Sequence, residues 1–166
     1  MITKYLIDTN ILIEAHRRYY AFDICSGFWD FITIQYKNNT IRSIDKVRNE
    51  LKTGDNLDIW VTNNLPKDFF CSTEDIKVAE KYSQIIRKIE AQHYNPNAKA
   101  IFADNADSWL IAYALAHDFT IVTMEVLEPN IKKSVKIPNV CKDFNIQYIN
   151  TYDLLRNLKG NFKLQN

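Results

Sequence analysis

The sequence has few of the residues that mark several classes of protein. Its 166 residues include 3 cysteines, which form no C-x-x-C pair, so neither a disulfide framework nor a structural zinc site is expected. Only 3 glycines and 4 prolines are present, which excludes collagen-like and low-complexity linker architectures. The 21 basic and 20 acidic residues leave a net charge of +1, so any nucleic-acid binding must come from a local patch.

Long uncharged apolar runs are also missing. Asp8, Asn10 and Glu14 interrupt the apolar start of the chain, whereas a membrane span needs about 20 predominantly apolar residues. Hydrophobic residues make up 46% of the chain and charged residues 25%, which are ordinary values for a globular protein. The sequence therefore predicts a single domain over residues 1–166 that is soluble and cytoplasmic.

Short apolar runs alternate with helical patterns along the chain. Strands are expected at residues 5–7 (with Ile2), 40–42, 69–71, 119–123 and 146–149. The runs at 5–7 and 119–123 are apolar on both faces, which is typical of central strands covered by helices on each side. The pattern predicts an α/β fold with three α/β/α layers and a central, mainly parallel sheet.

Helices are expected between these strands. Ser43 is a candidate N-cap for a helix ending at Gly54, and Thr151 for a terminal helix through Leu158. A long helix over 72–93 is expected to bury a stripe that begins at Ile76, and another helix starts at residue 105 or 106. Residues 94–103 are expected to form a turn and irregular structure.

Four acidic residues follow or flank the expected strands. Asp8 follows the first strand, Glu125 the strand at 119–123, Glu50 lies on the helix after the second strand, and Asp107 opens a helix. Ligands gather at the carboxyl ends of parallel strands, so these side chains can converge at one rim. Close carboxylates repel each other, and Mg²⁺ or Mn²⁺ would relieve that repulsion. The alternatives are a turn or cap role for Asp8, helix-dipole complementarity for Asp107, and a solvated face for Glu50.

Several segments resemble the PIN-domain superfamily. They are IDTNILIEA (7–15), the Glu50-Leu51 pair, ADSWLIAYALAHDFTIVTME (106–125) and IQYINTYDLL (146–155), and the first and third are similar to the hallmark segments of VapC-like toxin ribonucleases. The resemblance runs from Ile2 to about Leu155. The segments YYAFDICSGFWDFI (19–32) and VKIPNVCKDF (135–144) look like a little-characterised branch encoded beside helix-turn-helix antitoxin-like proteins.

The resemblance implies a PIN-like fold and a Mg²⁺- or Mn²⁺-dependent endoribonuclease. Such an enzyme would cleave single-stranded or loop RNA, leave 5′-phosphate and 3′-hydroxyl ends, and act as the toxin of a type II toxin–antitoxin pair. Its partners would be RNA and a cognate antitoxin of the helix-turn-helix type. The habit of the family and the 13% aromatic content are also compatible with a homodimer.

The resemblance also assigns roles to individual residues. Asp8, Glu50 and Asp107 match the first three acids of the family and would hold the metal. Glu125 stands where the family more often has Asp or Asn, and its longer side chain implies a metal contact through water. The remaining candidates are Thr9 and Asn10, which match positions that orient Asp8; Thr123, a similar hydroxyl near the rim; and Asp104, an extra ligand or a helix cap.

Basic and aromatic residues offer candidate RNA contacts. They are Arg17 and Arg18 beside Tyr19 and Tyr20, and the lysines Lys132, Lys133 and Lys136. Arginine charge next to tyrosine rings suits phosphates and unpaired bases. The alternatives are that the tyrosines belong to the core or a dimer interface and that the lysines form a solvated face.

Two other classes of function compete with the nuclease. A PIN-like protein can be a non-catalytic binding or scaffold module, although here all the core acids are present. A phosphatase or receiver-type phosphoacceptor would use Asp8 for the phosphoryl group, but neither a second acid next to it nor a signature lysine after a late strand stands out. Histidines His16, His93 and His117 lie near expected helix ends without an acid–base companion, so structural roles are expected for them.

Overall fold

The structure, a computed structural model, describes residues 3–164 and contains one parallel β-sheet. Its strands lie in the order β3-β2-β1-β4-β5. Their bounds are Tyr5–Ile7 (β1), Ile41–Ile44 (β2), Phe70–Cys71 (β3), Thr120–Val122 (β4) and Tyr148–Ile149 (β5). Every paired strand runs parallel to its neighbour, and Tyr5 stands opposite Ile41 on one side and Thr120 on the other. The predicted α/β class with a parallel central sheet is confirmed.

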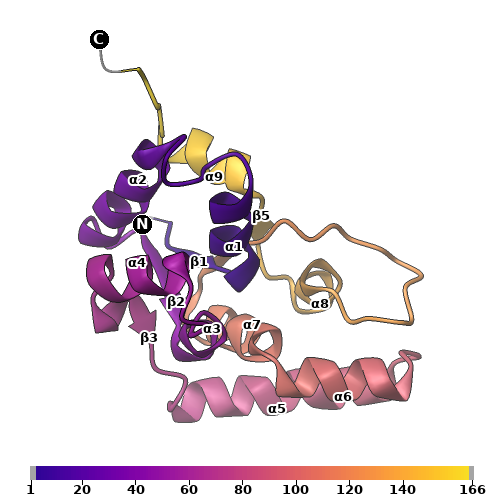
Figure 1. Cartoon of the computed structure of the whole chain (residues 1–166). Coiled ribbons are helices and arrows are strands. Elements are labelled where there is room, and N and C mark those ends of the chain that lie inside the picture. The colour runs from indigo at the N-terminus through magenta and orange to yellow at the C-terminus, as the bar shows by residue number, and fades with distance from the viewer. Residues whose placement is uncertain (1–2, 165–166) are drawn as a thin grey trace.

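Helices cover both faces of this sheet. In Figure 1, α1, α2 and α9 lie on one side of the strands, and α5, α6 and α7 lie on the other. The helices are α1 (Thr9–Arg17), α2 (Ser26–Lys37), α3 (Asp45–Glu50), α4 (Asn56–Asn64), α5 (Ile76–Ala91), α6 (Pro96–Asp104), α7 (Ala106–His117), α8 (Ile137–Phe144) and α9 (Thr151–Asn157), with a 3₁₀ turn at Lys67–Phe69. The three-layer arrangement expected from the sequence is therefore present.

The order of the strands reverses at the centre of the sheet. The chain adds β2 and β3 on one side of β1 and then crosses over to add β4 and β5 on the other. The side chains of Leu6 and Ile7 on β1, and of Ile121 and Val122 on β4, are fully buried. In open α/β sheets a ligand crevice lies at the carboxyl ends of the strands where the order reverses. Here that place is the edge where β1 and β4 end.

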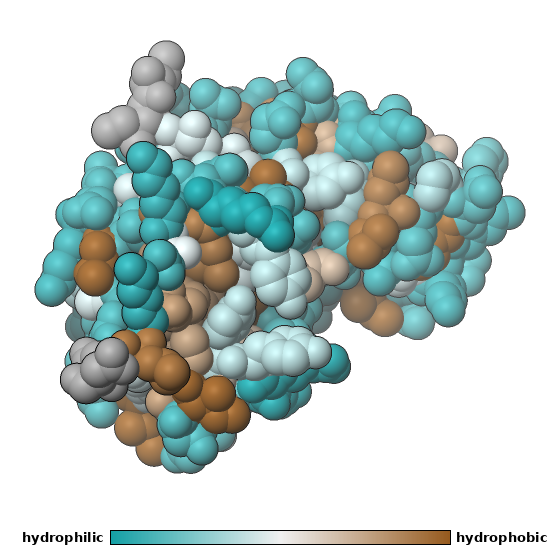
Figure 2. All heavy atoms as spheres, turned by 90° about the horizontal axis from the view of Figure 1, so that it is seen from above, coloured by the Kyte–Doolittle hydropathy of each residue, from teal (hydrophilic) through white to brown (hydrophobic). Residues whose placement is uncertain are grey.

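Exposed apolar residues line a groove near α2. Ile24 and Ile34 are exposed and line the same groove as Phe162 and Leu164 from the end of the chain. Figure 2 shows hydrophobic residues on this side of the molecule among mainly hydrophilic ones. Within residues 3–164, no helix is both long enough and apolar enough to span a membrane.

Several local predictions are wrong, each for an identifiable reason. Ser43 does not cap a helix: it is the third residue of β2, and its buried hydroxyl donates to the Ile7 carbonyl at 2.8 Å. The helix that follows ends at Glu50 rather than at Gly54. Thr151 is the first residue of α9, and Asn150 is its cap. The Ile2 contribution to the first strand lies outside the described residues.

Two further differences concern the face covered by α5 and α6. The segment expected to be irregular contains α6, which starts at Pro96, a residue that suits the first turn of a helix. The predicted stripe is wrong at its start: Ile76, the first residue of α5, is 79% exposed, and the buried residues of the helix are Val78, Ile85 and Ile89. These differences concern one helical layer and not the ends of β1 and β4.

Candidate metal centre

Asp8 directly follows β1, at the point where the strand order reverses. It occupies the N-cap position of α1, yet its carboxylate makes no capping hydrogen bond. The side chain is only 1% exposed. Its Oδ2 accepts a hydrogen bond of 3.1 Å from the hydroxyl of Thr123, the residue that follows β4. The Asp8 carboxylate is thus held between the ends of the two central strands and is not consumed in capping.

Asp107 reaches the same place from the start of α7. It is the second residue of that helix and is half-buried. Its backbone N–H donates to Oδ1 of Asn105, the N-cap residue, at 3.2 Å, and Asn105 Nδ2 donates back to the Asp107 carboxylate at 3.4 Å. The cap therefore both starts the helix and fixes the direction of the carboxylate.

The electrostatics of these two carboxyls show that they form part of one cluster. Burial raises the pKa of Asp8 to about 7, and the charges of Glu125 and Glu50 add to the rise, while the hydrogen bond from Thr123 opposes it. The pKa of Asp107 is raised to about 8. Burial is the largest cause, and the negative charges of Asp8, Glu125 and Glu50 raise this pKa further. The charges of Glu50 and Glu125 therefore act on both Asp8 and Asp107, although the four residues are distant in sequence.

Glu50 closes the cluster from the end of α3. Glu50 is exposed, but both of its carboxylate oxygens accept hydrogen bonds from other residues of the protein. Oε2 accepts a hydrogen bond of 2.5 Å from the Thr9 hydroxyl, and Oε1 accepts one of 3.1 Å from the backbone N–H of Ala106. Thr9 thus positions Glu50, whereas the family resemblance implied that it orients Asp8.

Glu125 lies on the opposite side of the cluster, after β4. Its Oε2 accepts a hydrogen bond of 2.7 Å from the backbone N–H of Ile137, the first residue of α8. Its own N–H donates to the Thr123 hydroxyl at 3.2 Å. That hydroxyl consequently links Glu125 to Asp8, in agreement with the supporting role predicted for Thr123.

Three helix N-termini surround the acids. Asp8 precedes α1, Asp107 lies in the first turn of α7, and Glu125 binds the first N–H of α8. The N-terminus of a helix carries partial positive charge and unpaired N–H groups, which stabilise nearby carboxylates. This arrangement tolerates concentrated negative charge, although the raised pKa values of Asp8 and Asp107 show that repulsion remains.

The donor set has the chemistry of a Mg²⁺ or Mn²⁺ site. All four side chains offer oxygen, and Mg²⁺ is commonly bound through one or two carboxylates with several waters retained. Within residues 3–164, however, no three His, Cys, Asp or Glu side chains are grouped so that they could hold one ion directly. An ion at this place would therefore have to complete its coordination with water, as Mg²⁺ commonly does. Direct binding of an ion by Glu50 stays a prediction.

Two of the predicted residues have other surroundings. Asp104 ends α6 and is exposed; the cap of α7 is Asn105, so the predicted capping role is wrong. The charge of Asp104 acts instead on Tyr82 of α5, whose pKa is raised first by burial and then by that charge. Asn10 is exposed in the first turn of α1.

The basic residues lie on two separate parts of the surface. Arg17 and Arg18 are exposed at the end of α1, where Arg18 pairs with Glu14. Lys132 and Lys133 are exposed on the loop between β4 and α8. Lys136 caps α8 and lies 3.6 Å from Glu128, so its charge is partly paired.

Sequence reasoning missed three contributors to this centre. Asn105 is one, although an Asn immediately before a helical pattern is the recognised signal for a cap. The other two are the backbone N–H groups of Ala106 and Ile137, which carry no side-chain signal and can be identified only in the folded structure.

Comparison with known protein families gives one match. A family model described as "Domain of unknown function (DUF4411)" matches residues 5–162. No curated protein matches the chain.

Proposed function

We propose that this chain, which belongs to the DUF4411 family, is a metal-dependent endoribonuclease of the PIN type. The observation that carries the proposal is the pair Asp8 and Asp107, two buried or half-buried carboxyls with raised pKa values at the point where the strand order reverses. Strongly perturbed carboxyls gathered in a crevice are characteristic of functional sites. The parallel α/β/α fold is compatible with the PIN superfamily.

Asp8 and Asp107 would hold Mg²⁺ or Mn²⁺, with Glu50 and Glu125 around it. When bound, the ion would supply Lewis-acid activation of a phosphodiester and lower the pKa of a water. The residues of the chain provide the preorganisation. Thr123 keeps a hydrogen bond on Asp8, Thr9 keeps Glu50 in place, and the N–H of Ile137 fixes Glu125.

The biological role proposed with this chemistry is that of a toxin in a type II toxin–antitoxin pair. The substrate would be single-stranded or loop RNA in the cytoplasm, and an antitoxin, which we propose to be of the helix-turn-helix type, would restrain the enzyme. Self-association as a homodimer belongs to the same proposal. These roles are supported by the resemblance of residues 7–15 and 106–125 to VapC-like ribonucleases.

A cleavage assay tests the proposed activity. Wild type, Asp8→Asn and Asp107→Asn are purified in parallel and incubated with structured RNAs and Mn²⁺ or Mg²⁺. We expect cleavage by wild type, a loss of at least a hundredfold in each variant, and no cleavage in EDTA. Asp104→Asn is the matched control, because this exposed Asp lies outside the cluster, and it should cleave like wild type. Equal residual activity in all four proteins would assign the cleavage to a contaminant and contradict the proposal.

A non-catalytic binding module is the second candidate, and one observation favours it. Both oxygens of Glu50 are already hydrogen bonded to Thr9 and Ala106, as in a cluster with a purely structural role. Calorimetric titration with Mn²⁺ separates the two candidates. A nuclease centre should give binding heat that Asp107→Asn abolishes, and a scaffold should give none.

A further inference from the structure

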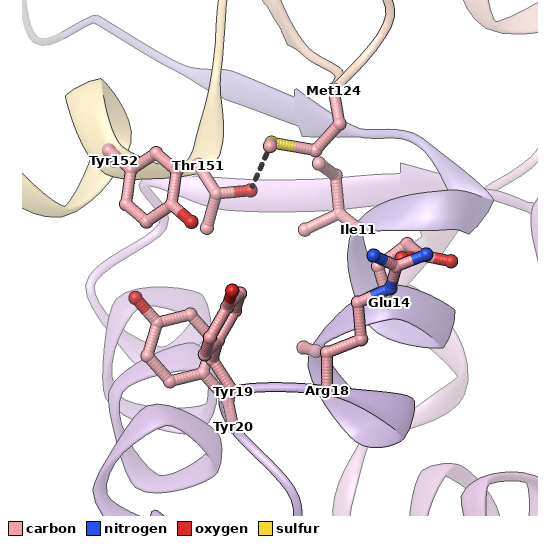
Figure 3. A pocket seen from close by; sticks show the side chains of 9 residues that line it. Ile11, Glu14, Arg18, Tyr19, Tyr20, Met124, Thr151 and Tyr152 are labelled. Carbon is pink, nitrogen blue, oxygen red and sulfur yellow. Dashed lines mark hydrogen bonds and ion pairs between the residues drawn. The ribbon is translucent and has the colours of Figure 1, made fainter.

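A small cavity lies beside the acidic cluster, and the proposed chemistry does not use it. It has a volume of about 140 Å³ and lies between the end of α1, the loop that follows it and the start of α9. We call it the tyrosine pocket. It is lined by Tyr19, Tyr20 and Tyr152 together with Ile11, Arg18 and Met124. Figure 3 shows Tyr19 and Tyr20 on one side of the space and Tyr152 and Met124 on the other.

The tyrosine pocket is continuous with the cluster through two short segments. Met124 stands between Thr123, which donates to Asp8, and Glu125. Ile11 is in the first turn of α1, and its N–H donates to the Asp8 carbonyl at 3.1 Å. A strand whose phosphate lies at Asp8 would therefore bring a neighbouring nucleotide over this pocket.

The size of the pocket selects among possible occupants. An apolar cavity of about 150 Å³ accommodates one benzene ring. The tyrosine pocket, at about 140 Å³, therefore has room for a single six-membered ring. Because the pocket opens to solvent on one side, a pyrimidine base fits it completely, whereas one of the two fused rings of a purine would stay partly outside.

The walls of the pocket are suited to a flat aromatic ring. The ring of Tyr20 stacks on Phe28 with centroids 4.7 Å apart and an angle of 5° between planes, so its orientation is fixed by the core. Tyr19 and Tyr152 are 74% and 41% exposed, which leaves their faces free for contact. The hydroxyl of Tyr20 is protonated at neutral pH, since the ordinary pKa of tyrosine is about 10 and burial and then the charge of Tyr152 raise the pKa of Tyr20; it can donate to a base carbonyl.

The polar edge of the pocket matches a nucleotide. Arg18, with 67% of its side chain exposed, pairs with Glu14, and both line the pocket. The Arg18 guanidinium offers hydrogen-bond donors and the Glu14 carboxylate offers acceptors, and the edge of a base carries groups of both kinds. The exposed guanidinium can also contact a phosphate. Thr151 donates to the Met124 sulfur at 3.5 Å, which holds Met124 against the pocket.

We propose that the tyrosine pocket binds one unpaired pyrimidine base of the RNA strand that crosses the acidic cluster. This inference rests on the proposed ribonuclease function and adds a base preference to it. Stacking on aromatic side chains tolerates any base; the selectivity here comes from the one-ring volume.

The test measures binding without cleavage. All variants are made in the Asp8→Asn protein, which is not expected to cleave RNA. Fluorescence anisotropy in EDTA measures its affinity for a short labelled oligouridylate and for a short labelled oligoadenylate. The Asp8→Asn protein should bind oligouridylate at least threefold more tightly than oligoadenylate. Adding Tyr19→Ala or Tyr152→Ala should weaken oligouridylate binding by roughly 5- to 100-fold, the range for loss of one base–aromatic stack.

Two further variants provide controls. Tyr19→Phe keeps the ring and should retain most of the affinity, and Ile59→Ala, at an exposed position on α4, should retain all of it. Unchanged RNA affinity in both tyrosine-to-alanine variants would overturn the proposal. The remaining occupant for the pocket would then be a protein. Equal loss for the two oligonucleotides would overturn the pyrimidine preference. Cleavage by wild type is measured separately, so failure of the nuclease proposal is distinguishable from failure of this one.

Discussion

At the scale of single residues, the main feature is a pair of carboxyls held where ionisation is unfavourable. Asp8 is 1% exposed, and it lies close enough to Asp107, Glu50 and Glu125 for their charges to interact. A protein fold under no functional constraint would gain by replacing one of these acids with a neutral side chain, because buried like charges destabilise it. The cost is understandable if a cation normally offsets it.

This reasoning gives a pH dependence with a definite sign. The pKa of Asp8 rises from 3.8 to about 7 on folding, and that of Asp107 from 3.8 to about 8. Between these values the folded state binds more protons than the unfolded state, so the free energy of unfolding falls as pH rises. The stabilising contribution of the two carboxyls to the free energy of unfolding is fully present below pH 3.8 and is lost by about pH 8. Urea unfolding in EDTA at pH 5.5 and pH 8.5 measures the loss.

Asp8→Asn is the comparison that isolates this effect. The variant should be more stable than wild type at pH 8.5 without metal, and its stability should fall less between the two pH values. Asp104→Asn should follow the wild-type curve. The same pH dependence in wild type and Asp8→Asn would contradict the assigned environment of Asp8.

A second prediction concerns the hydroxyl of Thr123. Its hydrogen bond favours ionised Asp8, so Thr123→Val should raise the pKa of Asp8 further and weaken Mn²⁺ binding at pH 7 by roughly tenfold, since a hydrogen bond to a charged group is worth about 1.5–3 kcal/mol. Thr123→Ser keeps the hydroxyl and should bind like wild type. Calorimetry on the three proteins checks the order, and equal affinity for all three would show that the hydroxyl has no role.

At the scale of elements, the site depends on where helices begin. Asn105 starts α7 and also donates to Asp107. Asn105→Ala should therefore lower the free energy of unfolding by about 1 kcal/mol through the lost cap. That loss corresponds to roughly 2–4 °C in Tm for a chain of this size. The same variant should weaken Mn²⁺ binding.

Asn95 offers a matched control for that prediction. It has the same N-cap position on α6, but its side chain makes no capping hydrogen bond. Asn95→Ala should change Tm by less than Asn105→Ala and leave Mn²⁺ binding unaltered. A larger effect at Asn95 would contradict the interpretation of Asn105 as the functional cap.

The elements that the sequence predicted best are those with strong hydrophobic patterns. The fully apolar runs at 5–7 and 119–123 could be recognised as central strands, and the polar residues after them marked the site. Ser43 was misassigned because a strand hydroxyl and a helix cap have the same local signature. The α6 segment was missed because its Asn95-Pro96 start is a turn signal as much as a helix start.

The candidate site could be predicted only in part for a similar reason. Asp8 and Asp107 follow or open recognisable elements, so their convergence could be expected. Glu50 and Glu125 each accept a hydrogen bond from a backbone N–H group, that of Ala106 and that of Ile137, and no side-chain pattern encodes those two contacts. The tyrosine pocket joins residues 11–20, 124 and 151–152, and only the folded chain shows that these segments meet.

At the scale of the whole molecule, metal binding should stabilise the fold. Asp8 lies between β1 and α1, and Asp107 at the start of α7, so an ion bound to both links two central layers. A ligand present at 100 times its Kd stabilises the folded state by about 2.7 kcal/mol, or roughly 5–10 °C in Tm at this chain length. Thermal unfolding with and without Mn²⁺ should show this gain for wild type and no gain for Asp107→Asn. Equal shifts in both would place the bound ion elsewhere.

The most direct measurement is a crystal of the protein soaked in Mn²⁺, with anomalous scattering used to locate the ion. The account predicts a Mn²⁺ peak in the crevice after β1 and β4, within direct coordination distance of both Asp8 and Asp107, with Glu50 and Glu125 reached directly or through water. A Mn²⁺ peak bound only by other residues, or an empty crevice at a concentration that gives calorimetric binding, would contradict it.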